Sequence, residues 1–404
     1  MFTVSATMFT HEHPHPTMNR GPAGTYLVTT TSGESVSAFM PNPLPPVPAL
    51  EFGDGRLQRL ERANLALGRL DGVSGFLPDP DLFLYTYVRR EAVLSSQIEG
   101  TKSTLSDLLL FELDEAPGVP LDDVIEVSNY VAALEHGMSR MRGGFPLCMR
   151  LIREVHEKLL SRGPGSAMKP GEFRRSQNWL GGTRPGNAIY VPPPWEHVED
   201  AMSALEQYIH TTGQDLPLIV RAGLVHLQFE TIHPFLDGNG RVGRLLIALM
   251  LHDAGVLRHP LLYLSLFLKQ NRAQYYRLLG MVRKTGDWES WIDFFLEGVE
   301  QTANDAVTTA RALLALFNED TRRITTIDRP AASVLHVFAA FRMRPIAHLR
   351  DVEKRTGLSY PTVRRAVEVL QGAGILVEIT AKKRDRVYSY PKYLAILNAG
   401  TEQV

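Results

Sequence analysis

The chain is poor in cysteine and contains no long apolar run. Cys148 is the only cysteine among 404 residues, so no disulfide can form within the chain and nothing points to an oxidising compartment. No apolar stretch is long enough to span a membrane, and the N-terminal segment lacks the basic-then-apolar order of a secretory signal. We therefore expect a cytoplasmic protein. Hydrophobic residues make up 44% of the chain, which is enough for a substantial core in two or three domains.

The chain also lacks a large net charge, but its charge is unevenly distributed. The formal net charge is −1, whereas residues 321–404 contain 15 Lys and Arg against 7 Asp and Glu. A basic C-terminal part behind an acidic body predicts a module that faces a polyanion.

The segment HPFLDGNGRVGR, residues 233–244, combines an imidazole, a carboxylate, an amide, two guanidinium groups and three glycines. Glycines let the backbone approach a ligand closely, and the first N–H groups of a helix predicted over 245–254 would point at that ligand. The pattern G-x-G-x-x-G matches a dinucleotide fingerprint, but residues 216–232 look helical where that fingerprint needs a strand. A Walker loop is excluded because no Lys-Ser/Thr follows the second glycine. A phosphate cradle is favoured over a plain helix–helix turn.

Residue by residue, this segment resembles the signature H-x-F-x-D/E-G-N-G-R-x-x-R of the Fic (Fido) family, whose members usually transfer AMP from ATP to a hydroxyl side chain of a protein. The resemblance implies that His233 is the general base and that Asp237 binds Mg²⁺. It also implies an anion hole around the α-phosphate, formed by Gly238, Asn239 and Gly240. The rest of the ATP-binding stretch would be Arg241 at the β-phosphate and Arg244 at the γ-phosphate, with Val242 and Gly243 between them.

A second resemblance lies upstream, in residues 91–101 (EAVLSSQIEGT). The pattern S/T-x-x-x-E-G/N at Ser95 and Glu99 is similar to the inhibitory helix of the same family, and residues four apart share one face of a helix. The resemblance implies that Glu99 pairs with Arg244 in the place of the γ-phosphate, so that the enzyme is autoinhibited. A helix-capping or surface glutamate is the alternative.

Between these motifs, residues 171–195 carry alternating apolar residues around Gly-Gly and Pro-Gly-Asn, which predicts a two-stranded hairpin. The hairpin resembles the flap of the family. By edge pairing it would dock the target protein through Gly181, Gly182, Ile189 and Tyr190. Farther along the chain, Asn271 and Tyr275 would line the adenine pocket, although aromatic residues at helical spacing are more often part of a core.

The basic C-terminal part has a recognisable order of elements. Helices are predicted over 331–342, 346–356 and 360–372, and strands over 374–379 and 387–390. This order resembles the winged-helix domains that are often fused behind Fic domains. In a DNA-binding domain the major groove would be contacted by Tyr360, Thr362, Arg364 and Arg365, and the phosphates by Lys382, Lys383 and Arg384. Dimerisation or protein docking is the alternative use of such a domain.

The sequence as a whole predicts a mainly α-helical Fic core with a short β-hairpin flap and a C-terminal winged helix-turn-helix domain. We divide it into a flexible arm (1–37, with a His-rich tract at 11–15), a helical region with the inhibitory helix (38–130), the catalytic core (131–315) and the winged helix (321–404). The expected reaction is transfer of AMP from Mg²⁺-ATP to a Tyr, Ser or Thr hydroxyl of a target protein, with the protein itself as one such target and a homodimer as a plausible assembly.

Two alternatives remain open. One is the reverse removal of AMP, or the use of another nucleoside triphosphate, by the same fold. The other is a DNA-binding transcriptional regulator whose Fic domain senses a nucleotide.

Overall fold

A helix with apolar residues on every side lies at the centre of the structure. The structure is a computed structural model, and it describes residues 20–76, 80–114, 118–211, 216–327, 332–380, 382, 385–399 and 401. In α7 (Leu218–Ile232) every residue from Ala222 to Ile232 is buried, as expected for a helix without a polar face. The helices that pack around it are α6 (Val198–His210), α8 (Asn239–Asp253), α10 (Arg272–Thr285) and α11 (Trp288–Thr325). The motif of residues 233–244 therefore begins where the central helix ends.

Further helices complete the core on the side where the predicted inhibitory motif lies. They are α1 (Asp54–Phe76), α2 (Pro80–Glu99), α3 (Leu105–Phe111), α4 (Leu121–Arg142), α5 (Met149–Leu159) and α9 (Ser265–Gln270). α2 packs against α4, α8 and α9, and α4 packs against α5 and α8. This packing brings the C-terminal end of α2 to the start of α8.

The prediction of a flexible arm over residues 1–37 was wrong for residues 24–37. β1 (Gly24–Thr31) and β2 (Glu34–Pro41) form an antiparallel hairpin, in which Gly24 lies opposite Pro41 and Thr31 opposite Glu34. Both connecting residues, Ser32 and Gly33, have positive φ angles of 52° and 80°, which is the backbone of a two-residue turn that matches the twist of a hairpin. The His-rich tract of the predicted arm lies outside the described residues.

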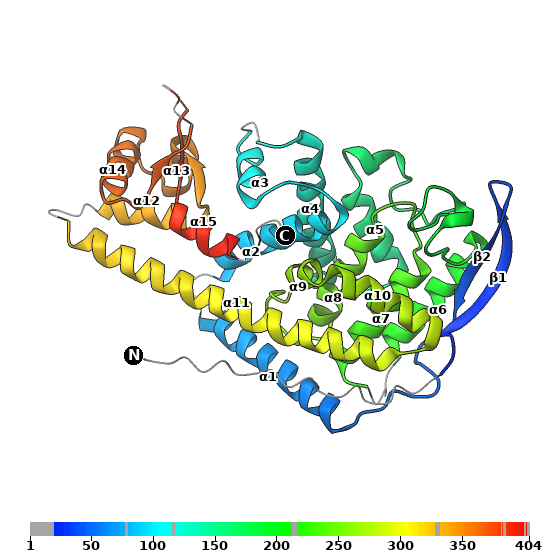
Figure 1. The fold of residues 1–404 in the computed structure, drawn as a ribbon. Helices are drawn as coiled ribbons and strands as arrows, with labels where there is room; N and C mark the ends of the chain where they lie inside the picture. Colours follow the sequence, from blue (N-terminus) through cyan, green and yellow to red (C-terminus); the bar gives the residue numbers. More distant parts are fainter. Residues whose placement is uncertain are drawn as a thin grey trace, which may run out of the picture.

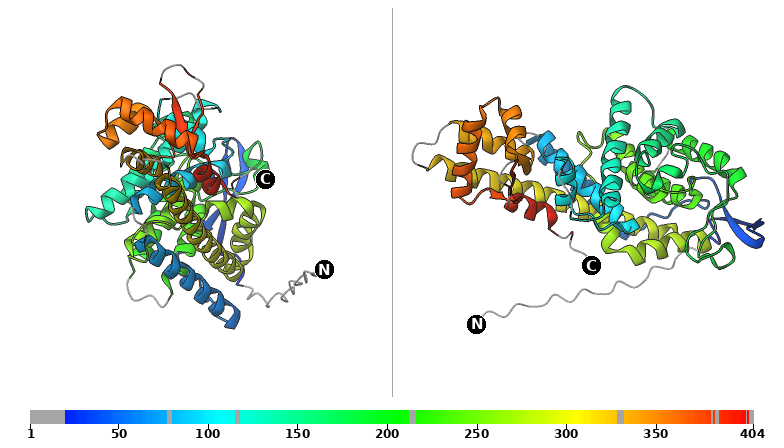
Figure 2. Two further views of the ribbon diagram at one scale, coloured as in Figure 1. Left: turned by 90° about the vertical axis from the view of Figure 1, so that its left-hand side faces the viewer. Right: turned by 90° about the horizontal axis from the view of Figure 1, so that it is seen from above.

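The longest helix, α11, connects the two ends of the elongated molecule (Figures 1 and 2). Its 38 residues correspond to about 57 Å at 1.5 Å per residue, and α1 packs along it. Two predicted domain boundaries are therefore wrong in detail. The boundary near residue 315 falls inside α11, and the one at 130 falls inside α4. The C-terminal part is joined to the core by a continuous helix.

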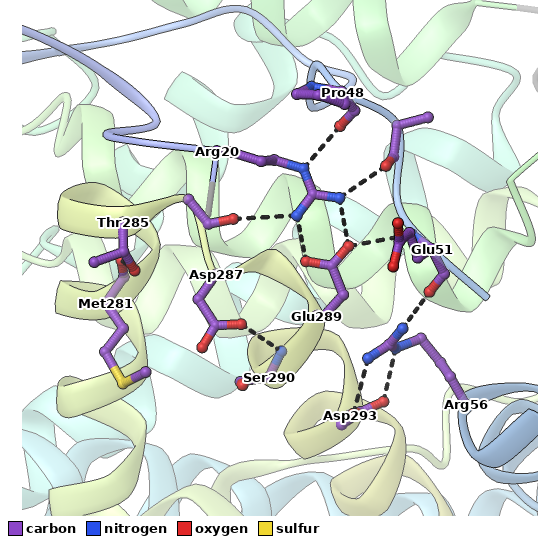
Figure 3. A network of polar contacts seen from close by, with 12 residues as sticks. Arg20, Pro48, Glu51, Arg56, Met281, Thr285, Asp287, Glu289, Ser290 and Asp293 are labelled. Carbon is purple, nitrogen blue, oxygen red and sulfur yellow. Dashed lines mark hydrogen bonds and ion pairs between the residues drawn. The ribbon is translucent and has the colours of Figure 1, made fainter. Parts of the chain in front are cut away.

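A network of charged residues fastens the N-terminal segment to the start of α11 (Figure 3). Arg20 forms an ion pair with Glu289 and donates hydrogen bonds to the carbonyl oxygens of Pro48 (2.9 Å) and Ala49 (2.7 Å). Nearby, Arg56 donates to both carboxylate oxygens of Asp293, at 2.8 and 3.0 Å. The base of the β1–β2 hairpin is therefore held in place against the core.

The C-terminal elements follow closely the order predicted from the sequence. They are α12 (Ala332–Met343), β3 (Ile346–His348), α13 (Leu349–Thr356), α14 (Tyr360–Gly372), β4 (Val377–Glu378), β5 (Val387–Ser389) and α15 (Pro391–Asn398). The predicted helix over 360–372 is confirmed. The helix predicted from 346 starts instead at Leu349, because residues 346–348 pair with β5 in a sheet of order β3–β5–β4. The sequence did not predict α15.

The C-terminal part packs on α2, the helix that ends in Glu99. The hydroxyl groups of Tyr393 (α15) and Thr86 (α2) lie 3.1 Å apart, and Arg90 of α2 donates to the carbonyl oxygen of Ala399 at 3.1 Å. Figures 1 and 2 show α15 beside α2. Within the described ranges, no helix has both the length and the apolar character that crossing a membrane requires.

Candidate active site

The turn between α7 and α8 places an imidazole beside a helix N-terminus. His233 ends α7 in the left-handed conformation (φ 50°, ψ 61°), and its N–H donates to the carbonyl oxygen of Phe229 at 2.9 Å. Gly238, also left-handed with φ 76°, caps the start of α8. Only a residue without Cβ adopts this conformation without strain, which explains a glycine at 238. For His233 the conformation is uncommon, and such residues are often found at functional sites.

The side chain of Asn239 holds the loop in shape rather than facing a ligand. Its Oδ1 atom accepts from the N–H of Phe235 (2.8 Å), and its Nδ2 atom donates to the carbonyl oxygen of Phe235 (2.9 Å). The N–H of Gly238 is bonded to Asp237 Oδ1 at 2.7 Å. Helix geometry leaves the N–H groups of the first turn of α8 without partners within the helix. The backbone at Asn239 and Gly240 can therefore bind an anion.

Glu99 already lies over that helix start. A Cβ atom built on Gly240 would be only 2.3 Å from Glu99 Oε1, so the carboxylate lies against the backbone of the predicted anion hole. Arg244 donates to Glu99 Oε1 (2.7 Å), Ser95 Oγ (2.8 Å) and the carbonyl oxygen of Ser95 (3.0 Å). The structure thus brings together Ser95, Glu99 and Arg244, as the resemblance predicted. A side chain at position 240 would displace the carboxylate of Glu99 from this position.

Electrostatics favours the charged form of this pair. Burial by itself would raise the pKa of Glu99, but the charge and hydrogen bond of Arg244, together with the charge of Arg241, hold it below its usual 4.5. Burial by itself would lower the pKa of Arg244, and Glu99 raises it above its usual value. Both groups are therefore ionised at neutral pH, and Glu99 presents a negative charge where the motif would bind phosphate.

Asp237 and Arg241 lie one turn apart at the same helix start. Arg241 Nη2 is 3.4 Å from both carboxylate oxygens of Asp237, and Arg241 Nη1 is 2.9 Å from Glu126 Oε1 of α4. Burial raises the pKa of Glu126, against the opposing effect of Arg241. Glu126 was not singled out from the sequence, because an acidic residue in the first turns of a helix is usually solvated.

His233 has the protonation state that a general base needs. Burial first, and then the charge of Arg174, lower its pKa from 6.5 to about 4, so the imidazole is neutral at physiological pH. The backbone of Glu230 opposes this lowering of the pKa, but among the described residues no partner lies within hydrogen-bond geometry of the buried Nδ1 atom. A neutral ring with an unengaged nitrogen can accept a proton from an incoming hydroxyl group.

Two residues that support the loop were missed by the sequence analysis. The ring of His156 (α5) stacks on Phe235 with centroids 3.7 Å apart, and its Nε2 atom lies 3.0 Å from the carbonyl oxygen of Asp237. Arg174 is buried and donates to the carbonyl oxygens of His233 (2.9 Å) and Pro193 (2.6 Å). The only signal for His156 was its position on the buried face of an amphipathic helix.

We expect His156 to make stability depend on pH. Burial lowers its pKa from 6.5 to about 4, so between these values the unfolded chain binds a proton that the folded state does not. Stability that is present above pH 6.5 is then lost as the pH falls, by about 2 kcal/mol between about pH 7 and pH 5 for this one histidine. Urea unfolding of the wild type and His156→Gln at both pH values measures the effect, and the variant should lose about 2 kcal/mol less than the wild type. An equal loss in both proteins would contradict the expectation.

The predicted flap is less regular than the sequence suggested. Instead of a two-stranded hairpin it contains a single bridge, in which the N–H of Leu180 donates to the carbonyl oxygen of Tyr190 at 2.8 Å. Gly181 and Gly182 both have positive φ angles, and the short 3-10 turn η2 (Pro185–Asn187) follows, so the two sides cannot continue as a ladder. Two further 3-10 turns, η1 (Pro164–Ala167) and η3 (Trp195–His197), flank the flap.

The remaining predicted site residues lie in different surroundings. Ile189 is 85% exposed, whereas Tyr190 is buried and donates from its hydroxyl to the carbonyl oxygen of Thr231 at 2.6 Å. Tyr275 is also buried, and its hydroxyl lies 2.9 Å from Nε2 of His226, so an adenine could stack on it only if its neighbours moved. The amide of Asn271 donates to the carbonyl oxygen of Phe267.

The candidate DNA-binding residues lie on the C-terminal part, well away from the 233–244 turn (Figure 1). On α14 the side chains of Tyr360, Arg364 and Arg365 are exposed, and Arg364 donates to Glu368 at 2.9 Å. Thr362 is half-buried and lies 2.9 Å from the hydroxyl of Ser359. Lys382 is exposed, while Lys383 and Arg384 lie outside the described residues.

Comparisons with known proteins agree with this geometry. The curated relatives include the proteins named "Protein adenylyltransferase Fic" of Drosophila grimshawi and Drosophila willistoni, which are 29% and 28% identical over 208 residues. The matched region covers 51% of this chain and only 40% and 39% of those two proteins. The likeness is therefore limited to about half of this chain.

Solved structures share the fold. A Fic family protein from Desulfovibrio desulfuricans G20 superposes with a TM-score of 0.56 at 19% identity, covering 84% of this chain and 97% of that one. Fic-1 (residues 134 to 508) from C. elegans gives a TM-score of 0.51 at 20% identity, covering 63% and 72%.

The family models match the two regions that form the site. Residues 57–139, which contain Ser95 and Glu99, match the description "Fic/DOC family N-terminal", and residues 146–251, which contain His156 and the 233–244 turn, match "Fic/DOC family". The part of the chain that builds the site therefore matches the Fic/DOC family.

Proposed function

We propose that this protein is a protein adenylyltransferase, which transfers AMP from Mg²⁺-ATP to a Tyr, Ser or Thr hydroxyl of a target protein and is inhibited by its own Glu99. The observation that carries the proposal is the carboxylate of Glu99 on the N-terminal turn of α8, held there by Arg244 beside the neutral imidazole of His233. A helix start that holds a carboxylate is suited to hold a phosphate, because both are anions that accept from backbone N–H groups. The names of the curated relatives support the same reaction class.

In the proposed reaction the imidazole of His233 takes the proton of the acceptor hydroxyl. The hydroxyl oxygen forms a bond to the α-phosphorus of ATP, the bond from this phosphorus to the oxygen that bridges to the β-phosphate breaks, and pyrophosphate leaves. The first N–H groups of α8 stabilise the charge that builds on the α-phosphate oxygens. Arg241 and Arg244 bind the departing phosphates, since a guanidinium fork matches two phosphate oxygens.

Asp237 is the residue that fits Mg²⁺. Its side chain is 43% exposed beside the first turn of α8, and carboxylate oxygens suit this cation. When bound, Mg²⁺ would neutralise phosphate charge next to Arg241. The carboxylate also accepts a hydrogen bond from the N–H of Gly238, at 2.7 Å.

Inhibition follows from competition for Arg244. The γ-phosphate needs the guanidinium that Glu99 occupies, and the α-phosphate needs the helix start on which the carboxylate of Glu99 lies. ATP can therefore bind productively only when the carboxylate moves away. Because the Glu99 side chain is 35% exposed, displacing it does not require the core to open.

Intact-protein mass spectrometry after incubation with ATP and Mg²⁺ tests the proposal, because self-modification needs no knowledge of the target. A mass increase of one AMP on the Glu99→Gly variant, or transfer of label from α-labelled but not γ-labelled ATP to an added acceptor, supports it. Parallel incubations with other nucleoside triphosphates identify a different donor by its different mass increase. Absence of any transfer by the Glu99→Gly variant would reject the adenylyltransferase assignment.

We further propose that the C-terminal part is a winged helix that binds DNA. The exposed positions of Tyr360, Arg364 and Arg365 along one helix support this candidate, because such side chains can contact bases and phosphates in a major groove. Contacts of α15 with α2 would connect DNA binding to the inhibitory helix.

Gel shifts with genomic fragments measure this second candidate. We expect Arg364→Ala with Arg365→Ala to weaken binding at least about tenfold, since each base-edge contact is worth about 1–3 kcal/mol. The matched control is Arg311→Ala, an exposed arginine of α11. Equal shifts for all three proteins, or no shift with the wild type, would contradict the DNA-binding assignment.

A further inference from the structure

A groove with a volume of about 560 Å³ lies between the β1–β2 hairpin, the flap and α10. Tyr26 and Ser37 line it from the hairpin, Ile189 from the flap, and Arg277 and Lys284 from α10. None of the residues that line it is acidic. The groove is thus a mixed surface with aromatic and aliphatic side chains on one side and positive charge on the other.

The walls of the groove are fixed to the core. The N–H of Ala23 donates to the carbonyl oxygen of Arg283 (3.2 Å), and the N–H of Phe39 donates to the carbonyl oxygen of Val191 (2.9 Å). The ion pair of Arg184 with Glu34 joins the flap to the tip of the hairpin. Below the hairpin, the network around Arg20 holds the N-terminal segment on α11 (Figure 3). A fixed groove is preorganised for a ligand, which lowers the entropy cost of binding.

The positive charge of the groove is not neutralised within the described protein. On α10, Arg277 lies about two turns before the adjacent pair Arg283 and Lys284. Among the described residues, none of the three forms a salt bridge with a carboxylate. Arg283 lies over the ring of Tyr190, 3.7 Å from its centroid. Glu34 of the hairpin is already paired with Arg184, and Glu230 of α7, on which the charge of Arg283 acts, is buried. The groove therefore complements a negatively charged ligand.

One residue of the groove lining, Tyr190, contacts the helix end that carries the predicted base. Tyr190 forms part of its lining, and the hydroxyl of this residue bonds to the carbonyl oxygen of Thr231, two residues before His233. The charge of Arg283 reaches His233 as well, where it adds to burial and Arg174 in lowering the pKa. Tyr190 therefore joins the groove to the end of α7 that carries His233.

From these observations we propose that the groove docks an acidic, extended segment of the protein that is modified. In an extended chain successive side chains point to opposite sides, so one set would pack on Tyr26 and Ile189 while the other pairs with Arg277 and Lys284. The exposed apolar side chains of Tyr26 (48%) and Ile189 (85%) lie in the groove that such a segment would cover. This inference rests on the proposed function, because a segment docked here is useful only if its hydroxyl is modified at His233.

Binding of a dye-labelled peptide tests the groove independently of catalysis. The probe alternates glutamate and valine around a central tyrosine, and its control has glutamine in place of each glutamate. We expect the acidic probe to bind the full-length protein at least about tenfold more tightly than its control in fluorescence anisotropy, and to lose this advantage in high salt. The double variant Arg277→Glu with Lys284→Glu should weaken binding of the acidic probe at least about tenfold, whereas Arg311→Glu on the distant face of α11 should leave it unchanged.

Equal binding of the acidic and the glutamine probe, or unchanged binding by the double variant, would overturn the inference. Thermal unfolding of the variants separates loss of the surface from loss of the fold, since the changed side chains are exposed. The test is also separable from the proposed reaction. If the Glu99→Gly variant transfers no AMP while the acidic probe still binds, the adenylyltransferase proposal fails but the docking surface stands.

Discussion

Replacement of His233 by alanine should abolish transfer of label from α-labelled ATP. A positioned general base contributes about 10²- to 10⁴-fold, and no other described residue presents a neutral, unengaged imidazole nitrogen at the start of α8. The effect is best measured in the Glu99→Gly background, where transfer is expected to be fastest. The rate should fall by at least about a hundredfold while the affinity for ATP changes little, because the proposed phosphate site is formed by α8 and not by the imidazole.

Two controls make this result specific. His197→Ala removes an exposed histidine of η3 and should leave the rate unchanged. Calorimetric titration with ATP shows whether His233→Ala still binds nucleotide. A variant that binds ATP normally and transfers AMP at the parent rate would exclude His233 as the base, whereas a variant that no longer binds ATP would indicate that His233 supports the loop instead.

Replacement of Glu99 by glycine should increase AMP transfer about tenfold or more. In the wild type, productive binding of ATP must break the charge-assisted hydrogen bond between Arg244 and Glu99, which has a length of 2.7 Å. Such bonds contribute about 1.5–3 kcal/mol, and partial exposure of Glu99 places this one at the lower end. About 1.4 kcal/mol corresponds to a factor of ten. Since Glu99 is the last residue of α2 and Gly100 follows, a glycine at 99 should cost the helix little.

Companion variants distinguish relief of inhibition from a general effect. Glu99→Gln removes the charge but keeps a similar shape, so its rate should be intermediate. Glu135→Gly removes an exposed carboxylate from α4 and should not raise the rate. Arg244→Ala also breaks the pair but removes the γ-phosphate ligand, so it should lower the rate. If Arg244→Ala raised the rate of AMP transfer as much as Glu99→Gly does, loss of the ion pair alone would explain the increase. Arg244 would then not be needed to bind the γ-phosphate.

The sequence could predict the residues of the site where the chemistry is local. Asp237, Gly238, Gly240 and Arg244 lie within one turn and the start of one helix, so their spacing alone brings them together. The helix over 360–372 was predictable for the same reason, because a glycine at 357 and a proline at 361 mark its start. Such turns and helix starts depend on the backbone preferences of neighbouring residues, so they do not require contacts between distant segments.

Long-range packing decided the rest. His156 and Arg174, which hold the 233–244 turn through the carbonyl oxygens of Asp237 and His233, are separated from it in sequence and carry no motif. The β1–β2 hairpin is a fixed wall because Arg20 reaches Glu289, and the flap is irregular because two glycines and a proline interrupt its pairing. A pattern could suggest that Glu99 meets Arg244, but only the packing of α2 on α8 places the carboxylate on Gly240. By itself the sequence determined which side chains can perform the chemistry. The tertiary structure determined that Glu99 occupies Arg244 and the start of α8, because contacts between distant segments depend on how whole helices pack.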